Sequence, residues 1–172
     1  MNFIDLLDLM SESPIILIGY SFKNERSKDR LLKKVNAISI NEDFNFKKFN
    51  RDDQINIILD SEEKIDTKYL VLDLNLHNNY LISVGKISDS FLRTASIRRI
   101  IEDLRSDIVN TVYRLIIVAA TNKISKDSSI YSRGPVEVAD LALVINESNK
   151  IDIIKNRRGA GLRVLHSKDI AF

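Results

Sequence analysis

The sequence predicts an α/β fold, a three-layer sandwich with a mainly parallel central sheet, and three observations lead to this prediction. Runs of consecutive apolar residues, typical of strands covered on both faces, recur along the chain. Segments with helical spacing separate the earlier runs, which indicates parallel strands joined through helices. The later runs follow one another through short connections, so antiparallel strands are expected at the C-terminal edge. A chain of 172 residues has the usual length of one domain, which we place over residues 1–172.

The first elements follow from apolar spacing and from proline and glycine. Residues 2–12 carry apolar side chains at helical spacing, and Pro14 ends this helix. The run 14–19 is the first buried strand, and Gly19 closes it. The polar, basic segment 20–30 leads into a helix through Leu31, Leu32 and Val35, and a short strand is expected at 37–40.

The remaining elements complete the sandwich. The clearest helix covers 89–111, and most of its arginines are expected to form its solvated face. Residues 123–135 form a polar, basic loop, and 136–138 open a turn. Apolar runs predict further strands at 69–74, 115–120, 141–145 and 151–154, and one or two edge strands at 162–165 and 170–172. Residues 55–59 form another apolar run, and the segment 75–86, with an apolar stretch at 80–84, is ambiguous.

Composition and charge limit the functional classes that remain. The 26 basic and 24 acidic residues leave a net charge of +2, so any contact with nucleic acid must come from a local surface. The chain has no cysteine, which excludes disulfides and thiolate chemistry and is typical of an intracellular protein. Its longest apolar runs, about seven residues, are shorter than the ~20 that a membrane helix needs. We therefore expect a cytoplasmic protein, or a nuclear one in a eukaryote, with no membrane partner.

Four segments, in order, resemble the core of the RecA, RadA and DnaB-type motor ATPases over about the last hundred residues. Residues 69–73 resemble the Walker B strand, which ends in an aspartate, and residues 115–122 resemble the next strand, whose polar tip senses the γ-phosphate. Residues 133–145 resemble the segment that follows the mobile DNA loop. Residues 153–159 resemble the basic hairpin that hexameric relatives point at a neighbour's nucleotide. The resemblance implies a RecA-like fold and a partner that is another RecA-like subunit or a second copy.

The chain departs from this family where the phosphate loop belongs. The first glycine, Gly19, is present, but the second glycine is replaced by Asn24 and the lysine that follows it is missing. A phosphate loop binds through consecutive backbone N–H groups in a conformation that side chains obstruct. We therefore expect no robust ATPase activity, and neither a cofactor nor a metal, with ATP and Mg²⁺ as the alternative. The resemblance leaves a degenerate nucleotide site at Gly19, Lys23, Arg26, Ser27, Asp73 and Asn122.

Two basic groups are candidates for DNA or subunit contact. The first is Lys123, Lys126 and Arg133, where relatives keep DNA-contacting loops. The second is Lys155, Arg157 and Arg158, the densest local positive charge of the chain. The alternative for both groups is an ordinary polar loop or hairpin tip, just as Asp73 and Asn122 can also be structural residues at strand ends. His77 and His166 have no ligand partners at suitable spacing, so no metal site is expected.

The sequence thus favours a non-catalytic RecA-like accessory or paralogue protein in DNA recombination, repair or replication, acting through protein and DNA contacts. One alternative is an ATP-binding enzyme with a divergent phosphate loop. In that case Lys23, Arg26 and Ser27 would contact phosphate, and Asp73 would hold Mg²⁺. Another alternative is a RecA-like scaffold subunit of an RNA-handling complex. All three rest on resemblance of fold, which by itself does not determine function.

Overall fold

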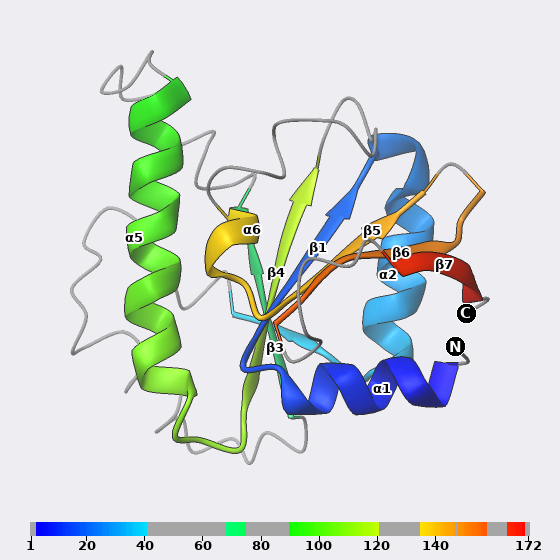
Figure 1. The fold of residues 1–172 in the computed structure, drawn as a ribbon, viewed down its shortest axis with the longest axis horizontal. Coiled ribbons are helices and arrows are strands. Elements are labelled where there is room, and N and C mark those ends of the chain that lie inside the picture. The colour runs from blue at the N-terminus through cyan, green and yellow to red at the C-terminus, as the bar shows by residue number, and fades with distance from the viewer. Residues whose placement is uncertain are drawn as a thin grey trace.

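The computed structural model describes residues 3–40, 68–74, 90–120, 135–146, 148–157 and 165–170. They form an α/β sandwich around one sheet, with seven described strands in the order β2-β3-β4-β1-β5-β6-β7 (Figure 1). The strands are β1 Ile15–Tyr20, β2 Ile38–Ser39, β3 Tyr69–Asp73, β4 Arg114–Ala120, β5 Leu141–Ile145, β6 Ile151–Asn156 and β7 Leu165–Ile170. The first five are parallel, whereas β6 and β7 are antiparallel additions at one edge.

Strand β1 lies in the middle of the sheet and organises both halves of the core. All six of its residues are buried, and it pairs in parallel with β4 on one side and with β5 on the other. Its alternate side chains point to opposite faces. Ile15 and Leu17 pack in one hydrophobic cluster, whereas Ile16, Ile18 and Tyr20 pack in the other.

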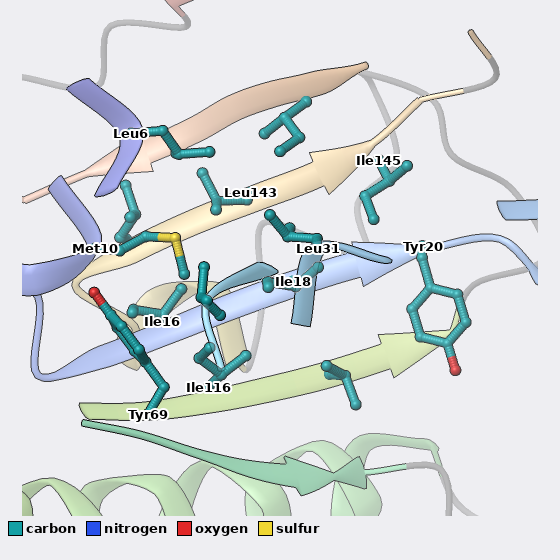
Figure 2. Packing of buried hydrophobic residues seen from close by; sticks show 14 of the residues in the cluster. Leu6, Met10, Ile16, Ile18, Tyr20, Leu31, Tyr69, Ile116, Leu143 and Ile145 are labelled. Carbon is teal, nitrogen blue, oxygen red and sulfur yellow. The ribbon is translucent and has the colours of Figure 1, made fainter. Parts of the chain in front are cut away.

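The helices cover the two faces and complete the three layers. Helices α1 (Phe3–Glu12) and α2 (Glu25–Lys34) lie over the face of Ile16 and Ile18, where Leu6, Met10 and Leu31 enter the cluster (Figure 2). Helices α5 (Ser90–Ile108) and α6 (Pro135–Val138) lie over the opposite face. Figure 1 shows α5 on one side of the sheet and α1 with α2 on the other. None of the described helices is long and apolar enough to cross a membrane.

Most predicted elements agree with the structure to within a few residues. The strand predicted at 141–145 has those bounds, and the helix predicted over 89–111 is α5. The turn expected at 136–138 is the short helix α6. The apolar runs at 55–59 and 80–84 lie outside the described residues.

The prediction for the C-terminal edge was one or two edge strands at 162–165 and 170–172. The structure describes one edge strand here, β7 Leu165–Ile170, which shares one residue with each predicted run, and the other residues of both runs lie outside the described ones. Four polar residues fill the middle of β7, and the strand is defined by its antiparallel pairing with β6. An edge strand needs backbone hydrogen bonds more than an apolar pattern, so periodicity missed it.

Candidate functional site

The parallel strands place their carboxyl ends at one edge, which we call the carboxyl edge of the sheet. Ligands of open α/β sheets bind outside this edge, where the chain changes direction across the sheet. Gly19 lies inside β1, in register with Ala119 of β4 and Val144 of β5. Asp73 ends β3 and is half-buried, but β4 separates it from β1, a spacing of about 10 Å across two strands. Gly19 and Asp73 therefore share the edge without being neighbours.

The segment after β1 forms a helical turn where the resemblance places a phosphate loop. Ser21 is extended (φ −90°, ψ 157°), and a 3₁₀ turn, η1 Phe22–Asn24, leads directly into α2. The N–H of Asn24 donates to the carbonyl of Ser21 at 2.8 Å, and the N–H of Glu25 donates to the carbonyl of Phe22. No residue between 20 and 27 has a positive φ. The alternating αR–αL backbone that forms an anion-binding nest is therefore missing from this segment.

Asn24 joins this turn to the connection between β5 and β6. Its side chain is almost fully buried, with the residue 4% exposed. Its Nδ2 donates to the carbonyl of Asn146 at 2.8 Å and to Oδ1 of Asn149 at 2.9 Å. Its Oδ1 accepts from the hydroxyl of Ser21 at 2.5 Å, and the hydroxyl of Ser27 donates to Asn149 Oδ1 at 2.6 Å. We call these five residues the asparagine clasp.

Hydrogen bonds within the β5–β6 connection fix the conformation in which it contacts Asn24. The Oδ1 of Asn146 accepts from the N–H groups of Ser148 and Lys150, at 3.0 and 3.1 Å. The N–H of Asn149 donates to the carbonyl of Asn146 at 2.9 Å. Asn149 adopts a left-handed backbone (φ 57°), which asparagine tolerates better than most residues. The connection therefore presents the Asn149 side chain to the start of α2.

The predicted nucleotide-site residues of this segment have different surroundings from one another. Lys23 and Arg26 are exposed to solvent, and the Ser27 hydroxyl is engaged by Asn149. The buried cation near the end of β1 is instead Lys28, whose ammonium lies 4.9 Å from the Tyr20 ring centre and 2.9 Å from Asp29. Burial alone lowers the pKa of Lys28, but the hydrogen bond to Asp29 and nearby negative charge raise it overall. Sequence reasoning missed Lys28, although its position one turn before Leu31 places it on the buried side of α2.

The opposite edge, where the parallel strands begin, is held by charges around Asp140. Asp140 directly precedes β5 and its side chain is 9% exposed. Its Oδ1 pairs with Arg105 of α5, and also with Arg157 at 3.2 Å, while its Oδ2 accepts from the N–H of Ile15 at 3.0 Å. The N–H of Asp140 donates in turn to the carbonyl of Ile15 at 2.9 Å. We call Asp140, Arg105, Arg157 and Ile15 the Asp140 hub.

The hub corrects the expectation for the arginines of the 89–111 helix. Arg98 and Arg99 are exposed as expected, but the Arg105 side chain is only 28% exposed and donates to the carbonyl of Val138 at 3.0 Å as well as to Asp140. Arg105 lies four residues after the buried Ile101 and three before the buried Ile108, which places it beside them on the helix. The helical pattern marked Arg105 as outside the apolar stripe and gave no sign of its buried partner.

The basic hairpin residues that the structure describes also bond within the fold. The Lys155 ammonium donates to the carbonyl of Val136 at 2.6 Å, and Arg157 pairs with Asp140 while remaining 47% exposed. Both lie at the edge where β5 begins, because β6 runs antiparallel to β5. They are therefore separated from the clasp by the length of β5, about 16 Å. The other predicted residues, Asn122, Lys123, Lys126, Arg133 and Arg158, lie outside the described residues.

Within the described ranges, no group of three His, Asp or Glu side chains is arranged to hold a metal ion.

Comparisons with known proteins identify no family for this chain. The chain matches no protein-family model and no curated protein in sequence. A solved structure from Pyrococcus horikoshii OT3, from a structural study that bears only a project number, matches with a TM-score of 0.44 and 15% identity. That match covers 92% of this chain and 94% of the other.

Proposed function

We propose that this chain is a non-catalytic RecA-like module, an accessory or paralogue subunit that acts in DNA recombination, repair or replication through protein and DNA contacts. The arrangement of the sheet supports the proposal. The strands that resemble the Walker B and sensor strands, β3 and β4, are parallel neighbours, and β4 also pairs with β1. Their carboxyl ends, with Asp73, lie at the edge where α/β proteins bind ligands.

The asparagine clasp is the observation that carries the non-catalytic part of the proposal. Asn24 occupies the place of the cradle glycine, and both N–H groups of its amide already have acceptors. The Ser27 hydroxyl, near the place of the Mg²⁺ ligand, is bonded to Asn149. Phosphate could enter only after these bonds broke, and the helical turn would then offer no nest of N–H groups.

A titration with ATP and Mg²⁺ tests this part. Ligand at 100 times its Kd stabilises a folded protein by about 2.7 kcal/mol, so binding would raise the melting temperature visibly. We expect no rise at millimolar nucleotide. A rise that Ser27→Ala or Asp73→Asn abolishes would instead establish the alternative, a divergent phosphate site.

DNA binding tests the other part of the proposal. Phosphate contacts by a local basic surface give an affinity that falls steeply with salt. We expect fluorescent oligonucleotides to bind at about 0.05 M salt and to dissociate at a few tenths molar, without ATP. Replacing Lys123, Lys126, Arg133 and Arg158 by glutamine examines the predicted basic residues outside the described ranges. If neither single- nor double-stranded DNA binds at low salt, the DNA part of the proposal is wrong.

A further inference from the structure

Helix α2 carries a straight line of positive charge on its outer face. Arg26, Arg30 and Lys33 are spaced four and three residues apart, which places them above one another on one side of a helix. All three are exposed, and the line covers about 10 Å along the axis. On the opposite side of α2, Leu31 and Val35 are buried against the sheet.

These three cations differ from the other cations of the helix in having no partner within the described part of the chain. The Lys28 ammonium is bound by Asp29 and the Tyr20 ring. The Lys34 ammonium lies 3.9 Å from the centre of the Phe3 ring in α1. Asp29, the acid on the flank of the line, is therefore already engaged by Lys28. Among the residues that the structure describes, this line of positive charge therefore has no acidic partner, although the whole chain carries a net charge of only +2.

An exposed aromatic residue precedes this line in the chain. Phe22 is 63% exposed in the turn that leads into α2, and exposed Lys23 follows it. Surfaces that bind single-stranded nucleic acid combine cations that follow the phosphates with aromatic rings on which bases stack. A duplex offers the cations its phosphates but keeps its bases stacked internally, so the exposed Phe22 ring favours a single strand.

We propose that Phe22, Lys23, Arg26, Arg30 and Lys33 form a binding surface for single-stranded DNA, which we call the α2 basic face. The inference rests on the proposed function and names the surface through which DNA is bound. The cations of α2 contact successive phosphates, and the Phe22 ring stacks on an unpaired base. This surface consists of other residues than the basic ones that the sequence singled out beyond residue 120.

Charge removal from the line is the first test. The triple variant Arg26→Gln, Arg30→Gln, Lys33→Gln keeps good helix formers at each position. Each lost phosphate contact removes about 0.7 from the salt slope for a single strand. We therefore expect the slope to fall by about 2 and the affinity for an oligo-dT of about 12 nucleotides to fall about a hundredfold at 0.1 M salt.

A matched pair of single variants separates a contact from an effect of net charge. Arg30→Gln and Arg99→Gln each remove one exposed arginine from a helix, but Arg99 lies on α5, over the opposite face of the sheet. We expect Arg30→Gln to weaken binding about fivefold at 0.1 M salt and Arg99→Gln to leave it within twofold. Equal losses from both variants would overturn the proposed surface.

The absence of tryptophan from the chain gives a direct readout of stacking. Phe22→Trp introduces the only tryptophan, and Val112→Trp is its control, since Val112 is 73% exposed in the connection between α5 and β4. We expect oligo-dT to quench the tryptophan fluorescence of Phe22→Trp and not that of Val112→Trp. Phe22→Ser should weaken binding about tenfold, which is within the range for loss of one stacked base.

The outcomes distinguish this inference from the proposed function. If the protein binds DNA but the triple variant binds equally well, the α2 basic face is wrong and the proposed function survives. If no DNA binds at low salt, both are wrong. Tighter binding of duplex DNA or of single-stranded RNA than of oligo-dT would overturn the choice of single-stranded DNA.

Discussion

Different interactions stabilise the two ends of the parallel strands. At each end, β1 or the turn that follows it is linked to the β5–β6 hairpin. Where the strands begin, the link is the Asp140 carboxylate with Arg105 and Arg157. Where they end, the link is the neutral amide of Asn24 with Asn146 and Asn149. One edge therefore depends on charge, whereas the other depends on hydrogen bonds between uncharged groups.

This difference bears on where a ligand can bind. A phosphate site needs N–H donors or cations that are free to meet the anion. At the carboxyl edge the clasp donors already have acceptors within the chain, and the buried Lys28 is paired with Asp29. The cations that have no partner among the described residues lie instead on the outer face of α2. Apart from the buried Lys28, the positive charge that follows β1 thus faces solvent.

The largest expected effect comes from removing the centre of the charged edge. Asp140→Ala leaves the buried N–H of Ile15 without its acceptor and removes the shared anion of Arg105 and Arg157. Breaking a fully buried ion pair costs about 3–5 kcal/mol, but both arginines reach solvent in part. We therefore expect a loss of about 3 kcal/mol in the free energy of unfolding, measured by urea denaturation.

The exposed pair Arg98–Glu102 on α5 is the matched control for this variant. Both side chains are about half exposed, at 50% and 51%, with an N–O distance of 3.0 Å. Surface pairs at this helical spacing contribute about 0.3–0.5 kcal/mol. Glu102→Ala should accordingly have little effect. A cost below about 1 kcal/mol for Asp140→Ala would show that the hub does not stabilise the fold.

The second effect tests the neutral edge. Asn24→Ala removes three hydrogen bonds: the two that its Nδ2 donates, to the carbonyl of Asn146 and to Oδ1 of Asn149, and the one that its Oδ1 accepts from the hydroxyl of Ser21. Asn146 and Asn149 keep their other donors, so each lost bond costs about 0.5–1.5 kcal/mol net, and we expect a loss of about 2 kcal/mol in chemical denaturation. Lys23→Ala, at the exposed neighbouring position, should stay within about 0.5 kcal/mol. Equal costs at the two positions would mean that the clasp contributes nothing.

The third effect compares how much Arg105 and Arg157 each contribute to the stability of the Asp140 hub. The Arg105 side chain is the less exposed of the two and has a second bond, to Val138. Arg157 is about half exposed and bonds Asp140 at 3.2 Å. We expect Arg105→Ala to cost about 2 kcal/mol and Arg157→Ala less than about 1 kcal/mol by thermal denaturation. The reverse order would indicate that the hairpin, rather than α5, depends on Asp140.

The central strands were predictable from the sequence because burial on both faces leaves a simple signal. β1 and β5 are continuous apolar runs, and their predicted bounds differ from the observed ones by one residue or none. The polar middle of the edge strand β7 was not predicted because its residues carry no such pattern. A run of apolar residues thus indicates a buried strand, whereas an edge strand such as β7 is defined mainly by its backbone hydrogen bonds, which the sequence does not show.

The candidate sites were less predictable because their partners lie far apart in the sequence. Asn24 and Asn149 are 125 positions apart, and Arg105 and Asp140 are 35 apart. Local spacing identified Asn24 as the residue that replaces a glycine but gave no sign of what its amide binds. It also identified Lys155 and Arg157 as a dense basic group without showing that both bond inside the fold. These partners became known only from contacts between segments that are far apart in the sequence.

The smallest effect is a loss of folding stability at alkaline pH, to which one group at each end of the parallel strands contributes. Burial raises the pKa of Tyr69, at the start of β3, while Arg114 opposes the rise and Asp8 adds to it. At the carboxyl edge, burial lowers the pKa of Lys28, but the hydrogen bond to Asp29 and nearby negative charge outweigh burial and raise it overall. A raised folded-state pKa means that the folded protein holds its proton more tightly than the unfolded chain. The stabilisation is therefore complete below about pH 10, near the ordinary values of both groups, and is lost as the pH rises through the folded-state pKa values.

Each group can contribute a slope of at most about 1.4 kcal/mol per pH unit, which urea titrations between about pH 9 and 11.5 can resolve. Tyr69→Phe should flatten part of the decline, and Lys28→Met should flatten the rest. If both variants lose stability with the same slope as the unchanged protein, the alkaline loss arises elsewhere. If only one of them flattens the slope, the alkaline loss of stability comes from a single end of the parallel strands. The charged and the neutral edges then differ in their response to pH as well as in their bonding.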